Sequence, residues 1–181
     1  MPVLAAAALL ALSACASSGL APSGSTRQVT VRSGDMKNST AWTFAVTPED
    51  RVVPTVVPLS ADSAWTAAQR AYVSLGLAVT RLDAAHRVIG SRPALAGHRL
   101  LGEPLSAFVD CGVNAARAPI VTVYTVTLAV TTQVVPVGGT SRVETLVQAR
   151  AQDPVHNNPA VTCSSSGRLE ARIAAQVAPR G

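Results

Sequence analysis

Three cysteines carry most of the reactive chemistry in this chain of 181 residues. They are Cys15, Cys111 and Cys163. A cysteine thiolate can act as a nucleophile or bind a metal, and an oxidised pair forms a disulfide. In an oxidising compartment an odd number of cysteines leaves one without a disulfide partner, so one of the three needs a separate explanation.

A thiol nucleophile is the first alternative. At Cys111 it would lie beside Asp110 and would need a base, for which the chain offers His86, His98 and His156. A catalytic cysteine requires a base within hydrogen-bond reach that a third group holds in place, and the spacing of these residues does not indicate such a set. A metal site is equally unsupported, because no Cys-x-x-Cys or His-x-x-x-His spacing occurs. We therefore expect no catalytic residues, no metal and no cofactor.

The amino terminus offers an explanation for the odd cysteine. An unbroken apolar run from Val3 to Leu12 ends in Leu12-Ser13-Ala14-Cys15. The run is too short to span a bilayer and has the size of a signal-peptide core. Its end resembles the lipobox of bacterial lipoproteins, in which a branched residue and two small residues precede a cysteine. The alternative is an ordinary cleaved leader with a chance cysteine.

The resemblance implies that residues 1–14 are removed as a signal peptide and that Cys15 carries diacylglycerol and a further acyl chain such as palmitate. Two or three acyl chains hold a protein stably on a membrane, whereas one holds it only marginally. Asp after the lipidated cysteine retains lipoproteins in the inner membrane of enterobacteria, so Ala16 favours the outer membrane. The stretch from Ala16 to Thr26 is small and polar and contains Gly and Pro, which predicts a flexible tether over residues 15–26. We expect an extracytoplasmic, periplasmic protein anchored to the outer membrane.

Lipidation of Cys15 would leave Cys111 and Cys163 as a pair, and we predict a disulfide between them. Such a bridge closes a loop of about 50 residues, for which chain entropy gives about 4 kcal/mol as an upper figure. Aromatic residues are only 3% of the chain, so the core consists mainly of Val, Leu, Ile and Ala and would gain from this covalent link.

The net charge of +5 raises nucleic acid as a possible partner. Lys37 is the only lysine among the 15 basic residues, and the arginines are scattered along the chain. This distribution favours a mildly cationic surface beside an anionic membrane, and we expect no nucleic-acid partner.

The first half of the folded region predicts strands, then a helix. Residues 27–58 form an extended N-terminal segment, whose last part, 52–58, suits a sheet edge because its prolines cannot donate to a ladder. A helix is expected from Ser60, as N-cap, to Leu75, with Gly76 as its stop. One helix face carries Trp65, Ala68, Tyr72 and Leu75. We expect Trp65 and Tyr72 to anchor the core; the alternative is that they line a ligand pocket.

Strands are expected at 77–82 and 87–91 and near 98–101, followed by a turn or single helical turn up to Cys111-Gly112. The strongest local pattern is a long hairpin, in which 120–135 and 142–152 alternate between apolar and polar residues around Gly138-Gly139. With the turn there, Leu128 faces Ala149 and Val130 faces Val147, so that both apolar faces coincide.

The last part of the chain predicts a loop at 153–160 and a closing helix at 165–178, with Cys163 at its entry. Leu169, Ile173 and Val177 face inward, and Arg168, Glu170 and Arg172 face outward. Residues 59–181 therefore predict an α+β domain, a two-layer arrangement in which an N-terminal and a C-terminal helix cover an antiparallel sheet.

This order of elements resembles the helix-grip domains of BamC-like outer-membrane lipoproteins. It is also similar to lipoproteins with Asp-Cys-Gly before a long hairpin and a Cys-Ser-x-Ser-Gly-x-Leu-Glu-like helix start, represented here by 110–112 and 163–170. Resemblance to BamC implies a noncatalytic accessory of outer-membrane protein assembly, a role that fold likeness alone cannot transfer.

Three classes of function remain open. The first is a noncatalytic interaction domain, tethered to the cell envelope through its lipid, with an envelope protein as partner. The second is a binder of a small apolar ligand or lipid in a cavity between helix and sheet. The third, an enzyme, is the least supported, because the sequence contains no convergent acid and base residues.

Overall fold

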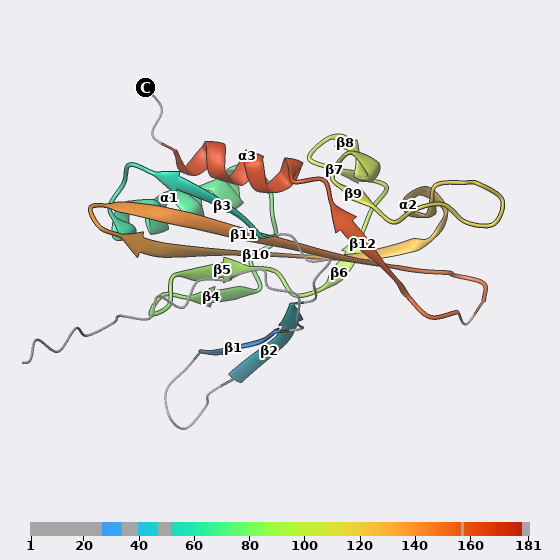
Figure 1. Ribbon diagram of the computed structural model, residues 1–181, viewed down its shortest axis with the longest axis horizontal. Coiled ribbons are helices and arrows are strands. Elements are labelled where there is room, and N and C mark those ends of the chain that lie inside the picture. Colours follow the sequence, from blue (N-terminus) through green and yellow to red (C-terminus); the bar gives the residue numbers. More distant parts are fainter. Residues whose placement is uncertain (1–26, 34–39, 47–51, 157, 179–181) are drawn as a thin grey trace, which may run out of the picture.

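The computed structural model describes residues 27–33, 40–46, 52–156 and 158–178. The leader 1–14, Cys15 and the tether up to residue 26 lie outside the described residues. The described chain is α+β, as predicted, with helices beside an antiparallel sheet (Figure 1). In chain order the elements are β1 (Arg27–Ser33), β2 (Thr40–Val46), β3 (Val52–Val57), α1 (Ala61–Ser74), β4 (Arg81–Asp83), β5 (Val88–Gly90), β6 (Ala94–Ala96), β7 (Arg99–Leu100), β8 (Glu103–Pro104), the 3-10 turn η1 (Leu105–Ala107), β9 (Val109–Asp110), α2 (Ile120–Val123), β10 (Thr125–Val137), β11 (Thr140–Gln152), β12 (Val161–Ser165) and α3 (Arg168–Val177).

The long hairpin of β10 and β11 is the centre of the fold. The two strands pair over their whole lengths, and the register places Leu128 opposite Ala149 and Val130 opposite Val147, as predicted. Gly138 has a φ of 59°, a left-handed conformation that a two-residue hairpin turn requires and glycine adopts without strain.

The predicted strand was wrong over its first residues. Residues 120–123 form the short helix α2, and the amide of Tyr124 donates to the carbonyl of Ile120. Pro119 precedes this helix, and a proline ring fixes φ at a value that suits a helix start.

Each strand of the long hairpin has two shorter neighbours, one at each end. β10 pairs with β6 through 126–128 and with β5 through 131–133, whereas β11 pairs with β12 through 149–151 and with β3 through 141–146. With β4 beside β5 and β9 beside β12, the described residues form an eight-stranded sheet. We call the half around Gly138 the turn end and the half that contains β6, β9 and β12 the open end. β3, from the predicted extended segment, is an edge strand of this sheet.

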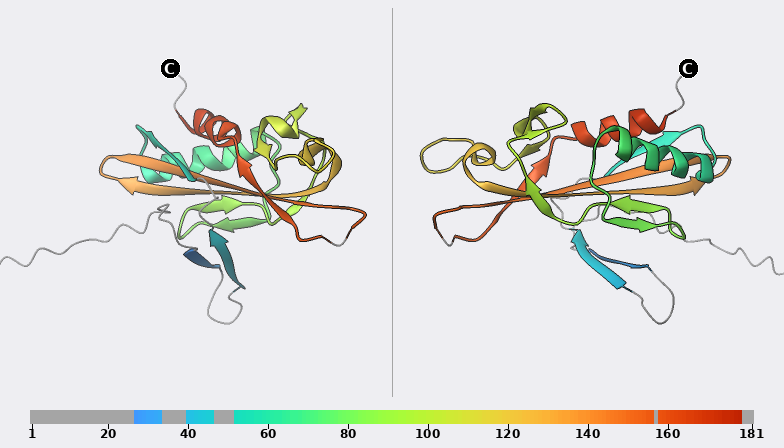
Figure 2. Two further views of the ribbon diagram at one scale, coloured as in Figure 1. Left: turned by 45° about the vertical axis from the view of Figure 1, so that its right-hand side comes forward. Right: turned by 180° about the vertical axis from the view of Figure 1, so that it is seen from behind.

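Helices α1 and α3 lie side by side on one face of the sheet (Figure 2). The apolar hairpin side chains alternate along the strands as predicted and are buried: Val126, Leu128, Val130, Val134, Val143, Val147, Ala149 and Ala151. The helices contribute Ala64, Ala68, Tyr72, Leu169, Ile173 and Val177. Trp65 and Leu75 are half-buried against the same cluster. The separate β1–β2 hairpin lies on the other side of the sheet (Figure 1).

A chain of hydroxyl groups crosses this apolar layer. Tyr72 Oη donates to the carbonyl of Ile89 at 3.3 Å and lies 3.0 Å from Thr132 Oγ1, which lies 2.9 Å from Thr145 Oγ1. Burial raises the pKa of Tyr72 far above its ordinary value, although the hydrogen bond to Thr132 acts in the opposite direction. Each buried hydroxyl thus has a hydrogen-bond partner, which a buried polar group needs.

β5 and β10 approach each other closely at Gly90. A β-carbon built there would lie 2.4 Å from the carbonyl oxygen of Val130. Beyond Gly90, the amide of Ser91 donates to that same carbonyl at 2.8 Å, and Ser91 Oγ accepts from the amide of Val130 at 3.1 Å. The Ser91 side chain thus continues the ladder between the ends of β5 and β6.

Three further boundaries and orientations differ from the prediction. The strands expected at 77–82 and 87–91 are the shorter β4 and β5. Cys163 lies in β12, which the sequence did not predict, so α3 begins only at Arg168. Glu170 is 1% exposed and does not face solvent, because Ser165 Oγ donates to its carboxylate at 2.6 Å across the start of the helix.

Candidate functional site

The structure contains the predicted disulfide. The Sγ atoms of Cys111 and Cys163 are 2.03 Å apart and join positions separated by 52 in the sequence. Cys111 follows β9 and Cys163 lies in β12, and these strands pair through Asp110 and Ser164. The bridge is buried in the main apolar cluster at the open end of the sheet.

Most residues of the alternative catalytic set have other partners. The Cys111 thiol is consumed by the disulfide, so it is not a nucleophile while the bridge is intact. The Asp110 carboxylate accepts from the amide of Gly112 at 2.8 Å. His98 lies beside a small hollow described below.

The other two histidines belong to two similar Asp-x-x-His turns. In each turn the aspartate accepts from the histidine amide and from its Nδ1, with Nδ1–Oδ2 distances of 2.9 Å for both Asp83–His86 and Asp153–His156. This geometry fixes the imidazole, and both histidine side chains are largely exposed, His86 to 61% and His156 to 70%. In the described part of the chain, no group of three or more His, Cys, Asp or Glu side chains is placed to hold a metal. The sequence reasoning missed both turns, although their common spacing was a detectable signal.

Hydrogen bonds strongly stabilise the ionised carboxylate in the Asp153 turn. The amide of Val155 and the imidazole of His156 lower the pKa of Asp153 to about 2. Removal from water, followed by the charge and hydrogen bonding of Asp153, raises the pKa of Tyr124. The carboxylate therefore acts as a fixed anion that organises the loop between β11 and β12.

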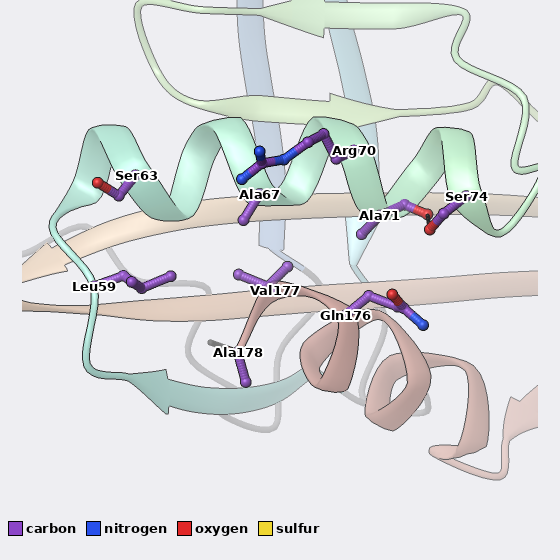
Figure 3. Close-up of a pocket in the computed structure, with 9 residues that line it drawn as sticks. All are labelled: Leu59, Ser63, Ala67, Arg70, Ala71, Ser74, Gln176, Val177 and Ala178. Carbon is purple, nitrogen blue, oxygen red and sulfur yellow. Dashed lines mark hydrogen bonds between the residues drawn. The ribbon is translucent and has the colours of Figure 1, made fainter. Parts of the chain in front are cut away.

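A groove between α1 and the end of α3 is the larger of two described hollows (Figure 3). Its volume is about 460 Å³, within the range of small-molecule sites. Ala67 and Val177 lie on its opposite sides, and Arg70 and Gln176 extend from α1 and α3, respectively. The other lining residues are Leu59, Ser63, Ala71, Ser74 and Ala178.

Helical spacing explains the groove. Residues 63, 67, 70, 71 and 74 fall on one face of α1, one to three turns apart, and four of them are Ala or Ser. Small side chains leave space beside the last turn of α3, whereas bulky ones would fill it. Ser60, the predicted N-cap, accepts from the amide of Ser63 at 3.3 Å and so fixes the start of this helix.

The charge that lines the groove is positive. Arg70 is the only charged residue among those that line it, and its side chain is exposed. The acidic residue on α1, Asp62, is bound by Arg87 at 2.8 Å and so does not neutralise Arg70. The lining thus combines an apolar floor with one cation at its edge.

A smaller hollow of about 270 Å³ lies at the open end, between β6 and α2. Apolar side chains dominate its lining, including Leu95, which is 75% exposed, and Val123, which is 45% exposed. His98, Tyr124 and Thr125 are the residues with polar side chains in its lining. Among these residues we find no charged group that would orient a ligand.

The sequence did not predict either hollow. Trp65 and Tyr72, for which a pocket was the alternative, line neither of them and instead belong to the core. The stripe of Ala and Ser beside Arg70 on α1 was visible, but its meaning depends on α3, which is about 100 residues away in the chain.

No protein-family model and no curated protein matches this chain. In the described ranges, no helix has the length and apolar character needed to cross a membrane.

Proposed function

We propose that the protein is a lipoprotein, anchored through Cys15 to the outer membrane, that presents a noncatalytic interaction domain at the cell envelope. The disulfide between Cys111 and Cys163 is the observation that carries this proposal. It accounts for two of the three cysteines and leaves Cys15, in its lipobox-like context, for the lipid. Disulfides also persist mainly in extracytoplasmic compartments.

The arrangement of α1 and α3 supports a helix-grip-like domain. Both helices cover one face of an antiparallel sheet, and their inward side chains, such as Tyr72, Leu169 and Ile173, are fully buried. The domain thus has a rigid layered scaffold from which surface features can recognise an envelope partner.

Metabolic labelling with palmitate tests the anchor. The parent chain should incorporate label, and Cys15→Ser should lose it together with membrane association. A matched control replaces the other two cysteines, because Cys111→Ser/Cys163→Ser should retain the label. Label on the Cys15→Ser chain, or free thiols on Cys111 and Cys163 in the mature protein, would refute the proposal.

Recovery of a partner tests the interaction domain. The acylated full chain, extracted from membranes in mild detergent, should bring down an envelope protein in stoichiometric amount. Consistent recovery of the chain alone would count against this role.

The groove favours a second function, binding of a small apolar ligand. The interface between helices and sheet is filled by side chains, whereas the groove between α1 and α3 has an open volume of about 460 Å³. Native mass spectrometry after mild extraction should then detect a small bound molecule. A chain that always carries no adduct would argue against this function.

A further inference from the structure

We infer that the groove between α1 and α3 binds a single-chain amphiphile with an anionic head group, such as a long-chain carboxylate. This inference rests on the second proposed function, ligand binding, and does not depend on the lipid anchor.

The shape of the groove determines the apolar part of the ligand. Ala67, Ala71 and Val177 form a surface without large side chains, and Leu59 closes one end. The groove has a volume of about 460 Å³ that is partly open to solvent, so it suits one flexible chain lying along α1 better than a bulky ligand.

The charge of the groove determines the head group. Arg70 is the only charged lining residue, and a guanidinium forms strong paired hydrogen bonds with a carboxylate. No aspartate or glutamate lines the groove, so an anion meets no repulsion there, and a cationic head group finds no partner. Ser63 and Ser74 line the α1 side, where Ser63 Oγ accepts from Ser60 Oγ at 3.0 Å and Ser74 Oγ donates to the carbonyl of Ala71 at 3.0 Å.

A small ligand fits the groove better than a protein does. A stable protein interface buries about 800 Å² on each partner around a cluster of large anchors. The groove extends along only a few turns of α1 and the last residues of α3, and its floor consists of small side chains. It therefore suits a narrow chain rather than a folded surface.

Titration of the full chain, carrying Cys15→Ser so that no detergent is needed, tests the inference. The probes are dodecanoate, dodecanol and dodecyltrimethylammonium, all below their aggregation concentrations and followed by NMR of the labelled probe. Dodecanoate should bind at least tenfold more tightly than the other two, because it alone combines the chain with the anion.

Two variants locate the binding site. Arg70→Gln should weaken dodecanoate binding about tenfold or more and leave dodecanol binding unchanged. Ala67→Trp should abolish the binding of both by filling the groove. The matched controls are Arg150→Gln, an exposed arginine on another element, and Val73→Trp, a position 78% exposed on α1. Both controls should bind like the parent.

Several results would overturn the inference. They are equal affinity for the three probes, parent-like dodecanoate binding by Arg70→Gln, or the same loss in Arg150→Gln as in Arg70→Gln. Because Arg70 is exposed, its variant remains informative even if Ala67→Trp fails to fold. Palmitate labelling with no dodecanoate binding would refute this inference alone, whereas dodecanoate binding without labelling would refute only the anchor.

Discussion

The two ends of the long hairpin are stabilised by different means. At the turn end, α1 and α3 cover the sheet, and apolar packing with one hydroxyl chain holds the layers together. At the open end the Cys111–Cys163 disulfide joins β9, a strand of two residues, to β12. Where the long helices cover the sheet, side-chain packing holds the layers together. At the other end, a covalent link joins β9 to β12.

An ionic cluster adds to the stability of the open end. Glu103 is bound by Arg168 at 2.7 Å and also by Arg172, and both guanidinium groups lie above the ring of Phe108, 5.5–6.0 Å from its centroid. Phe108 is fully buried. The cluster attaches the start of α3 to the β7–β8 hairpin. Because α3 also covers the turn end, the cluster connects the two ends.

Loss of the disulfide should have the largest effect. Cys111→Ser/Cys163→Ser should lower the free energy of unfolding by about 4 kcal/mol, since the unfolded chain regains the freedom of a long loop. Hydrogen exchange should accelerate most in β9 and β12, and less in α1. Chemical denaturation of the parent in reductant should match the variant. A uniform acceleration in α1 and β12 would contradict separate stabilisation of the two ends.

Removal of a core side chain from α3 should come next. Ile173→Ala leaves a cavity between helix and sheet, for which we expect a loss of about 3 kcal/mol. Here exchange should accelerate in α1 and α3, the reverse of the disulfide variant. Ala171→Gly, an exposed site on the same helix, is the control and should cost about 1 kcal/mol through helix propensity alone. Equal losses in the two variants would show that the buried contact adds nothing.

Loss of the Tyr72 hydroxyl should have a smaller effect. Tyr72→Phe leaves Thr132 without one of its partners and should destabilise by about 1 to 2 kcal/mol. Thr132→Val combined with Tyr72→Phe should cost less than the sum of the single variants, because they remove the same hydrogen bond. Simple additivity in denaturant titrations would show that the two hydroxyl groups are not coupled.

The smallest expected effect is a dependence of folding stability on pH, caused by Asp153 in the loop at the open end. Asp153 has a pKa of about 2 in the folded protein, below its ordinary 3.8, so its contribution is present above about pH 4 and disappears as the pH falls towards 2. Asp153→Asn should remove this dependence. The melting temperatures of parent and variant should therefore differ by a constant amount above about pH 5 and converge near pH 2. A difference that stays constant down to about pH 2 would contradict the assigned role.

The same division explains what the sequence could predict. The hairpin register, the Ser60 cap and the buried face of α1 follow from alternation and helical spacing, which are local signals. β6, β9 and β12 are two to five residues long and exist because β10, β11 and the disulfide hold them, so their sequences carry no periodicity of their own. Burial of Glu170 and the groove beside Arg70 likewise depend on contacts between segments far apart in the chain.

The close approach at Gly90 constrains how this chain can diverge. A side chain at this position must displace the backbone of β10, the central strand of the sheet, whereas exposed neighbours such as Leu82 on β4 can change freely. Among related sequences that keep the fold, we expect Gly90 to be retained while the exposed residues around it vary. Together with the two bridged cysteines, that glycine would serve as an anchor for aligning remote homologues.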